Sequence, residues 1–280
     1  MTRCAHGSTF AFQLSRAGHD VTVVARGSRL ERLRRDQAIV TATGEQAAVR
    51  VAAELDTTTP WDLVLVTVLG SEVDVLLQRL ADCAARTVMF MFNIFESLDR
   101  FRDAVGPERT VFGFPAVVAV IRDGELEFTV LRRGTPSTVS DERWATVFSD
   151  AGIPSTVHPD MQGWLRTHAA FVVPVLLAGQ SAHRTGHGLG RREATALARA
   201  LREGLSLVRQ LGNTLTPSPI GILGRLPIVV IAALLWTATR LPVFVRTSSV
   251  APTDELAAQI DEMDSTAPQG TPALLAVRPE

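Results

Sequence analysis

Three short apolar runs, separated by helical patterns, constrain the fold of the first half of this chain more than any other feature. The runs cover residues 21–25, 63–68 and 87–92 and are rich in β-branched side chains. Runs of this kind are typical of strands buried on both faces. Helical patterns lie beside them at residues 8–17 and 73–84. Strands that alternate with helices predict an α/β fold with a doubly wound, Rossmann-type parallel sheet.

The pattern changes after residue 106. Residues 111–121 and 125–131 flank an Asp-Gly pair and predict a β-hairpin, which we expect to extend the sheet at one edge. Beyond residue 158 the sequence predicts helices over residues 161–179, 191–211, 222–239 and 253–263, and a loose tail after residue 265. We therefore expect a nucleotide-binding domain over residues 1–155 and an all-helical domain for substrate binding and dimerisation over residues 156–280.

The most apolar segment, residues 226–239, is bounded by Arg225 and Arg240. It is shorter than the about 20 residues that span a bilayer, so a buried core helix is favoured and no membrane partner is expected. No basic-then-apolar signal segment begins the sequence, which favours a cytoplasmic location. A net charge of −1 gives no general attraction for nucleic acid.

Every basic side chain apart from histidine is an arginine, because the sequence contains no lysine. Codon bias in a GC-rich genome accounts for this composition, and it excludes a lysine general acid, a Schiff base and a phosphate-loop lysine. Cys4 and Cys83 are too few for a disulfide framework. His183 and His187 have a spacing that suits metal binding on a helix, but the glycines around them disfavour a helix, so no metal is expected.

A dinucleotide-binding motif needs a strand, a tight glycine turn and a helix whose first amides receive the pyrophosphate. Gly7 matches the third glycine of G-x-G-x-x-G, and Ser8 and Thr9 follow it in the predicted helix. Thr2 and Cys4 stand where the other two glycines belong. We expect the first strand to be missing or incomplete, and a wrongly assigned start codon is an alternative explanation.

Arg26 directly follows the apolar run 21–25, the second strand of the dinucleotide-binding motif, at the place where an acidic residue would bind the ribose of NAD. A planar guanidinium suits a phosphate monoester through paired hydrogen bonds. We therefore predict NADP as the cofactor, bound by Gly7, Ser8, Thr9 and Arg26. The alternative is that residues 26–35 form a solvated basic helix face.

Eight stretches of the sequence together resemble one known family, namely residues 7–11, 14–27, 62–68, 90–93, 106–109, 113–115, 164–166 and 261–264. That family is the ketopantoate reductases (2-dehydropantoate 2-reductase, ApbA/PanE). The resemblance covers nearly the whole chain and is most specific in its first 115 residues. It implies a Rossmann-type domain, a helical domain and reduction of a small 2-oxo acid with NADPH.

The resemblance also implies site residues. Asn93 stands where the family has an asparagine that contacts both cofactor and substrate. Arg166, two residues after Trp164, replaces the catalytic lysine, and Ala170 replaces a substrate-binding asparagine. Because an arginine, whose pKa lies far above neutral pH, is a poor proton donor, we name Arg166, Asn93 and His168 together as the candidate catalytic residues.

His168 is the candidate substitute acid. It lies two residues beyond Arg166, a turn of about 200°, so the two are not expected to share a helix face. The alternative is a structural histidine bonded to a neighbour.

Two hypotheses follow. The first is an NADPH-dependent reductase, forming a homodimer and acting on a small 2-oxo acid, with altered acid chemistry. The second is a non-catalytic nucleotide-binding or relic protein that keeps the fold. Because motif glycines and the lysine are replaced, weak NADPH binding and slow ketopantoate reduction are expected.

Overall fold

The computed structural model of this chain describes residues 5–131, 135–249 and 251–280. The chain forms two compact units. The N-terminal unit comprises residues 1–92 and 99–161, and the C-terminal unit comprises residues 93–98 and 162–280. The short segment 93–98, which follows a strand of the N-terminal unit, is therefore part of the helical unit.

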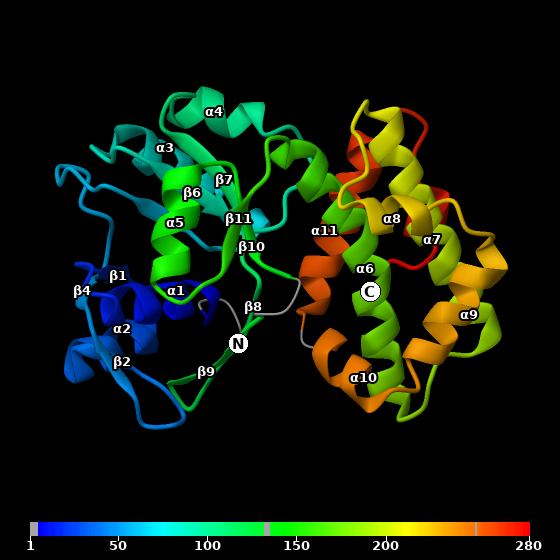
Figure 1. The fold of residues 1–280 in the computed structure, drawn as a ribbon, viewed down its shortest axis with the longest axis horizontal. Helices are drawn as coiled ribbons and strands as arrows, with labels where there is room; N and C mark the ends of the chain where they lie inside the picture. Colours follow the sequence, from blue (N-terminus) through cyan, green and yellow to red (C-terminus); the bar gives the residue numbers. More distant parts are fainter. Residues whose placement is uncertain (1–4, 132–134, 250) are drawn as a thin grey trace. The chain divides into compact units, whose positions relative to one another are not determined.

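The N-terminal unit contains a five-stranded mixed sheet (Figure 1). Its strands, in spatial order, are β11 (Ser155–Val157), β10 (Ser137–Val139), β7 (Thr110–Phe114), β6 (Val88–Met91) and β5 (Val64–Val66). The β5–β6 and β6–β7 pairs are parallel, whereas β10 runs antiparallel to β7. β-Branched and aromatic residues dominate these strands, and the four residues of β6 are all buried.

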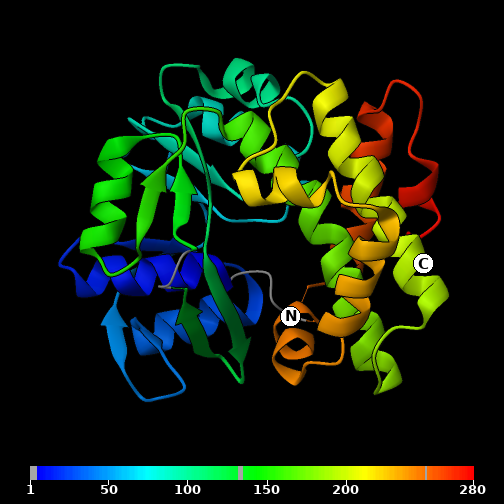
Figure 2. The ribbon, with the colours of Figure 1, turned by 45° about the vertical axis from the view of Figure 1, so that its right-hand side comes forward.

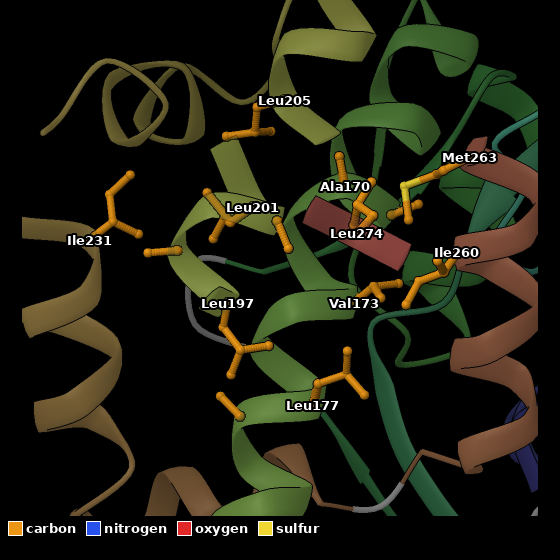
Figure 3. Close-up of a cluster of buried hydrophobic side chains, with 14 of the residues drawn as sticks. Ala170, Val173, Leu177, Leu197, Leu201, Leu205, Ile231, Ile260, Met263 and Leu274 are labelled. Carbon is orange, nitrogen blue, oxygen red and sulfur yellow. The ribbon is translucent and has the colours of Figure 1, made fainter. Parts of the chain in front are cut away.

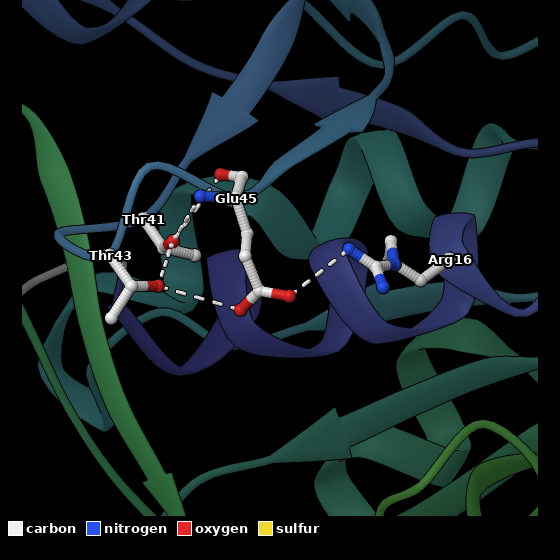
Figure 4. A network of polar contacts seen from close by, with 4 residues as sticks. All are labelled: Arg16, Thr41, Thr43 and Glu45. Atoms are coloured by element: carbon white, nitrogen blue, oxygen red, sulfur yellow. Dashed lines mark hydrogen bonds and ion pairs between the residues drawn. The ribbon is translucent and has the colours of Figure 1, made fainter.

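Three further strand pairs belong to this unit. They are the parallel pair β1 (Thr22–Val24) and β4 (Arg50–Ala52), and the antiparallel pairs β2 (Ala38–Val40) with β3 (Gln46–Ala48) and β8 (Val117–Arg122) with β9 (Glu125–Val130). A polar network closes the β2–β3 turn, in which the Thr41 hydroxyl accepts from the Glu45 amide at 3.0 Å (Figure 4). The Glu45 carboxylate then pairs with Arg16 at 3.3 Å.

The helices of the N-terminal unit pack against these strands. They are α1 (Ala5–Arg16), α2 (Gly27–Asp36), the 3-10 turn η1 (Gly70–Glu72), α3 (Asp74–Asp82), α4 (Asp99–Val105) and α5 (Glu142–Asp150). Helix α1 lies along the β8–β9 hairpin (Figure 2). Its Phe10 is fully buried and meets Phe148 of α5 edge to face, with ring centroids 5.0 Å apart.

The predicted hairpin forms, but the structure corrects its extent and its place. Asp123 and Gly124 make the turn with positive φ angles of 49° and 84°, as the sequence predicts. The expectation of one strand over residues 111–121 is wrong, because Pro115, which lacks an amide hydrogen, separates β7 from β8. The expectation that the hairpin extends the large sheet is also wrong, since β8 and β9 form a separate two-stranded sheet, and Leu126 of β9 forms a single bridge with Thr41.

The expected incomplete first strand and the replaced glycines at Thr2 and Cys4 lie outside the described residues.

The C-terminal unit is helical. Its helices are α6 (Met161–Thr185), α7 (Arg191–Gln210), α8 (Ser218–Leu223), α9 (Ile228–Ala238), α10 (Pro242–Ser248), α11 (Thr253–Thr266) and α12 (Pro272–Leu275). Small and aliphatic side chains from α6, α7, α9, α11 and α12 meet in one core (Figure 3). The predicted fold class, a Rossmann-type α/β unit joined to a helical unit, is confirmed.

Helix α9 differs from the buried core helix that the sequence favoured. The predicted continuous helix over residues 222–239 is interrupted, because Pro227 disfavours helical geometry at Leu226 and instead caps α9. One face of α9 enters the core through Ile231 and Leu235. The opposite face is exposed, with half of the Leu234 side chain accessible.

None of the described helices is long and apolar enough to cross a membrane alone. Taken together, α9 and α10 have the length and the apolar composition of a membrane-spanning segment, but the two helices meet at an angle of 96°.

The tail after residue 265 is not loose, contrary to expectation. Leu274 of α12 is fully buried in the helical core. Its amide donates to Glu203 of α7 at 2.8 Å, and the Thr271 amide donates to Asp264 at 2.7 Å. Composition alone missed this anchoring because one buried leucine and two carboxylates are enough to order a short polar segment.

Two adjacent leucines of α9 provide a test of its orientation. We expect Leu235→Ala to lower the free energy of unfolding by about 2–5 kcal/mol, because Leu235 is 6% exposed and leaves a cavity. Leu234→Ala, on the exposed face of the same helix, should change it by less than about 0.5 kcal/mol. Urea unfolding of both variants measures the difference, and equal losses would contradict the orientation.

Candidate active site

Gly7 lies in the first turn of α1, where the helix approaches the end of β5. A side chain at this position would overlap the hydroxyl of Thr67, which follows β5. Only glycine permits this approach of helix to strand, which is the role of the third glycine in a dinucleotide-binding turn. The assignment of Gly7 to that position stays a prediction.

The side chains of the two residues after Gly7 form hydrogen bonds with other residues of the N-terminal unit. The Ser8 hydroxyl accepts a hydrogen bond from Arg29 of α2 at 3.1 Å. Thr9 is fully buried, and its hydroxyl donates to the Ala5 carbonyl at 2.9 Å. In this structure the side chains of Ser8 and Thr9 thus support the helix, and the backbone amides of the first turn are the groups that suit an anion.

The three arginines after β1 have different surroundings. Arg26 caps the N-terminus of α2 with an extended backbone, and its exposed side chain makes no hydrogen bond or ion pair with any described residue. Arg29 also donates to the Gly124 carbonyl at 3.0 Å. The guanidinium of Arg32 lies against Gly124, where a side chain would overlap it. Arg29 and Arg32 therefore hold α2 to the β8–β9 turn, and Arg26 faces solvent.

His6 is a neighbour of Gly7 that sequence reasoning missed. Burial lowers the pKa of His6, and a hydrogen bond with the backbone of Val117 opposes that shift. The residue lies one position before the motif glycine, where any side chain is allowed, so the motif carries no signal for it.

The C-terminal unit holds the segment 93–98 through side chains of two helices. The Glu262 carboxylate of α11 accepts from the amides of Phe95 and Glu96 at 2.8 and 2.7 Å. Gln162 of α6 accepts from the Leu98 amide at 2.8 Å and donates to the Glu96 carbonyl at 2.9 Å. Nearly every polar backbone group of the segment's centre is therefore bonded, which fixes the course of the chain after Asn93.

Asn93 and His168 come together. His168 Nδ1 lies 2.9 Å from Asn93 Oδ1, although 75 residues separate them in the sequence. The imidazole ring also stacks on Trp164 with a centroid distance of 5.1 Å and an interplanar angle of 5°. Burial lowers the pKa of His168 to about 4, so the ring is neutral near pH 7.

Arg166 reaches the same segment from the other side of its helix. Its Nε donates to the Phe95 carbonyl at 2.8 Å, and a terminal nitrogen donates to Asn213 Oδ1 at 2.7 Å. The side chain is 9% exposed. The guanidinium therefore binds the loop that carries Asn93.

Ala170, which stands where the family has an asparagine, belongs to the core. It is fully buried, and a side chain on Gly204 of α7 would come within 3.1 Å of its Cβ. Helices α6 and α7 pack so closely here that a longer polar side chain has no room. Among the described residues no group of three or more His, Cys, Asp or Glu side chains could hold a metal ion.

Comparison with known proteins identifies the first half of the chain. Residues 4–139 match the family model described as "Ketopantoate reductase PanE/ApbA". These residues belong to the ketopantoate reductase family. The resemblance that the sequence analysis found is thereby confirmed for this stretch, and a search of curated protein sequences gives no match.

Solved structures of ketopantoate reductases resemble the whole chain. A PanE/ApbA family ketopantoate reductase from Ralstonia eutropha JMP134 is 19% identical with a TM-score of 0.71, over 98% of this chain and 93% of that one. A 2-dehydropantoate 2-reductase from Geobacter metallireducens GS-15 is 13% identical with a TM-score of 0.71, over 98% and 95%. D-mandelate dehydrogenase in complex with NADH is 12% identical with a TM-score of 0.67, over 98% and 93%. At these identities the likeness shows the fold.

The lowered pKa of His168 predicts a pH dependence of stability. The unfolded histidine takes up a proton near pH 6.5 and the folded one near pH 4, so the contribution is complete above pH 6.5 and is lost as pH falls toward 4. The loss should reach up to about 3 kcal/mol. Urea unfolding between pH 4 and 8 should show a steeper decline for the wild type than for His168→Gln, and parallel curves would contradict it.

Proposed function

We propose that this chain is a nicotinamide-dinucleotide-dependent reductase of small 2-oxo acids, with NADPH as its preferred cofactor. The observation that carries the proposal is the hydrogen bond between Asn93 and His168. The family places an asparagine like Asn93 beside cofactor and substrate, and here that amide is oriented by a neutral imidazole. The family membership of residues 4–139 supports the reaction class.

The described residues of the N-terminal unit fit such a cofactor. The first-turn amides of α1 are the backbone donors that suit a pyrophosphate. The exposed guanidinium of Arg26 suits a 2′-phosphate, because it can donate two parallel hydrogen bonds. When bound, the cofactor supplies a hydride. The amides and Arg26 supply binding, while Ser8 and Thr9 support the helix.

The carbonyl oxygen of a 2-oxo acid gains negative charge during reduction, and a hydrogen-bond donor must stabilise it. Asn93 Oδ1 accepts the Nδ1 proton of neutral His168, so Asn93 Nδ2 remains the donor of the amide. We assign to that amide the stabilisation of the developing alkoxide, as in an oxyanion hole, with water as the proton source.

Arg166 acts as a positioning residue in this proposal. Its guanidinium is bonded to Phe95 and Asn213. It holds the backbone two residues beyond Asn93, which keeps the amide in place. The small-molecule substrate and the expected homodimer stay predictions.

Cofactor preference tests the role of Arg26. We expect Arg26→Ala to weaken NADPH binding about 10- to 100-fold and to leave NADH binding unchanged, because only NADPH carries the 2′-phosphate. Arg34→Ala, which removes another exposed arginine of α2, is the matched control and should change neither. Titration calorimetry measures both affinities. An equal change for the two cofactors would show that Arg26 does not bind the 2′-phosphate.

A variant series tests the Asn93–His168 pair. With NADPH and ketopantoate or another small 2-oxo acid, Asn93→Ala should lower kcat about 10²- to 10³-fold with little change in NADPH affinity. His168→Ala should lower kcat less, and His168→Gln, whose amide can donate to Asn93, should recover part of the loss.

Steady-state NADPH oxidation and binding titrations separate the two hypotheses. Cofactor binding without turnover of any 2-oxo acid would favour the non-catalytic alternative. Full activity of Asn93→Ala would show that the Asn93 amide does not stabilise the developing alkoxide.

A further inference from the structure

Exposed apolar side chains lie on the solvent side of α9 and at the start of α10, and together we call them the apolar face. On α9 its residues recur at helical spacing on one side. They are Val229, Val230, Ala233, Leu234 and Trp236, and Leu241 and Val243 follow at the start of α10. Val229 is 75% exposed and Val243 is 57% exposed. Exposed apolar side chains that gather in one patch mark a surface that binds a partner.

The segment that carries the apolar face has only positive charges. Residues 204–253 contain four arginines and no aspartate or glutamate. Arg225 precedes α9, Arg240 follows it, and Arg246 lies in α10, all with exposed side chains. In the part of the chain that the structure describes, none of these arginines forms an ion pair. A partner of this surface must therefore be apolar at its centre and anionic at its rim.

An apolar residue of α9, Trp236, contacts one of the arginines, Arg240. The Arg240 guanidinium lies over the Trp236 ring, 3.4 Å from its centroid. The same guanidinium donates to the carbonyl oxygens of Trp236 and Leu189, so these contacts together hold a cation at the C-terminal end of α9. Tryptophan and arginine together are typical of helices that lie in the interface of a lipid bilayer.

A second copy of this chain fits the surface less well. A two-fold interface brings the same patch of both copies together. The arginines of one copy would then face a segment that contains arginines and no acidic residue, which is unfavourable.

We propose that the apolar face and its arginines bind the surface of an anionic lipid membrane. The apolar side chains of α9 and α10 enter the boundary between headgroups and acyl chains, and Arg225, Arg240 and Arg246 pair with phosphates. The sequence predicted no membrane partner because no segment spans a bilayer. Binding at the surface needs no spanning helix, and the 96° bend between α9 and α10 suits two short helices lying on it.

Vesicle sedimentation with the full chain tests the proposal. The wild type should sediment with vesicles of phosphatidylglycerol and phosphatidylcholine but not with pure phosphatidylcholine, and added salt should weaken the binding. The variant Val229→Asp/Leu234→Asp should bind at least about tenfold more weakly, because two apolar side chains no longer leave water. Val75→Asp, at an 81% exposed valine of α3, is the control and should bind like the wild type.

The arginines are tested separately. Arg225→Ser and Arg246→Ser should each weaken binding to anionic vesicles about fivefold. Arg143→Ser, at an exposed arginine of α5, is the control and should leave it unchanged. Thermal unfolding confirms that each variant is folded.

Three results would overturn the proposal. They are no sedimentation with anionic vesicles at low salt, equal binding to both vesicle types, and unchanged binding by the double variant. Light scattering measures the oligomeric state and so tests whether a second copy of this chain binds the apolar face. A dimer that Val229→Asp/Leu234→Asp dissociates, without vesicle binding by the wild type, would assign the apolar face to a second copy.

Discussion

The hydrogen bonds that fix segment 93–98 on the helical unit are the constraint on which the candidate site depends. The strand β6 ends at Met91, and the chain that continues from it is bonded by one carboxylate of α11 and by side chains of α6. Bonds from amides to an ionised carboxylate such as Glu262 are stronger than neutral ones. Asn93 gains a defined orientation because the residues after it are hydrogen-bonded to helices of the C-terminal unit and because His168 binds its side chain.

The absence of lysine gives arginine structural roles that its chemistry suits. Arg109 illustrates this, because its guanidinium donates to the carbonyls of Ala81, Cys83 and Val105 at 2.6 Å each. These carbonyls lie at the ends of α3 and α4, where helices leave acceptors unsatisfied. Arg166 does the same for the loop after Asn93. A planar group with five donors binds several carbonyls at once, and it does not act as a proton donor. The reaction we propose therefore depends on an amide donor.

The two faces of α9 show why a high apolar content has more than one structural meaning. Ile231, Ala232 and Leu235 pack into the core, and the exposed side of the same helix is equally apolar. A helix that is apolar all round is usually buried on every side. Here only one face is covered, and the arginines at both ends remain in water, so the chain keeps an apolar surface with a cationic rim.

Much of the fold follows from local patterns in the sequence. The apolar runs identify β1, β5 and β6, the Asp-Gly pair identifies the hairpin turn, and the helical periodicity identifies α6, α7 and α11. These features depend on neighbours a few residues apart, so the sequence by itself determines them. It also determines that no lysine can act and that Arg26 stands at the end of β1.

The tertiary structure alone decided which distant residues meet. Asn93 bonds to His168, 75 residues away, and the Glu262 carboxylate binds the Phe95 amide, 167 residues away. The burial of Ala170 and the exposure of one face of α9 also arise from helix packing. Periodicity shows that a helix has an apolar face, but not which helix covers it or which polar side chain reaches a given loop. Those outcomes depend on how the whole unit packs.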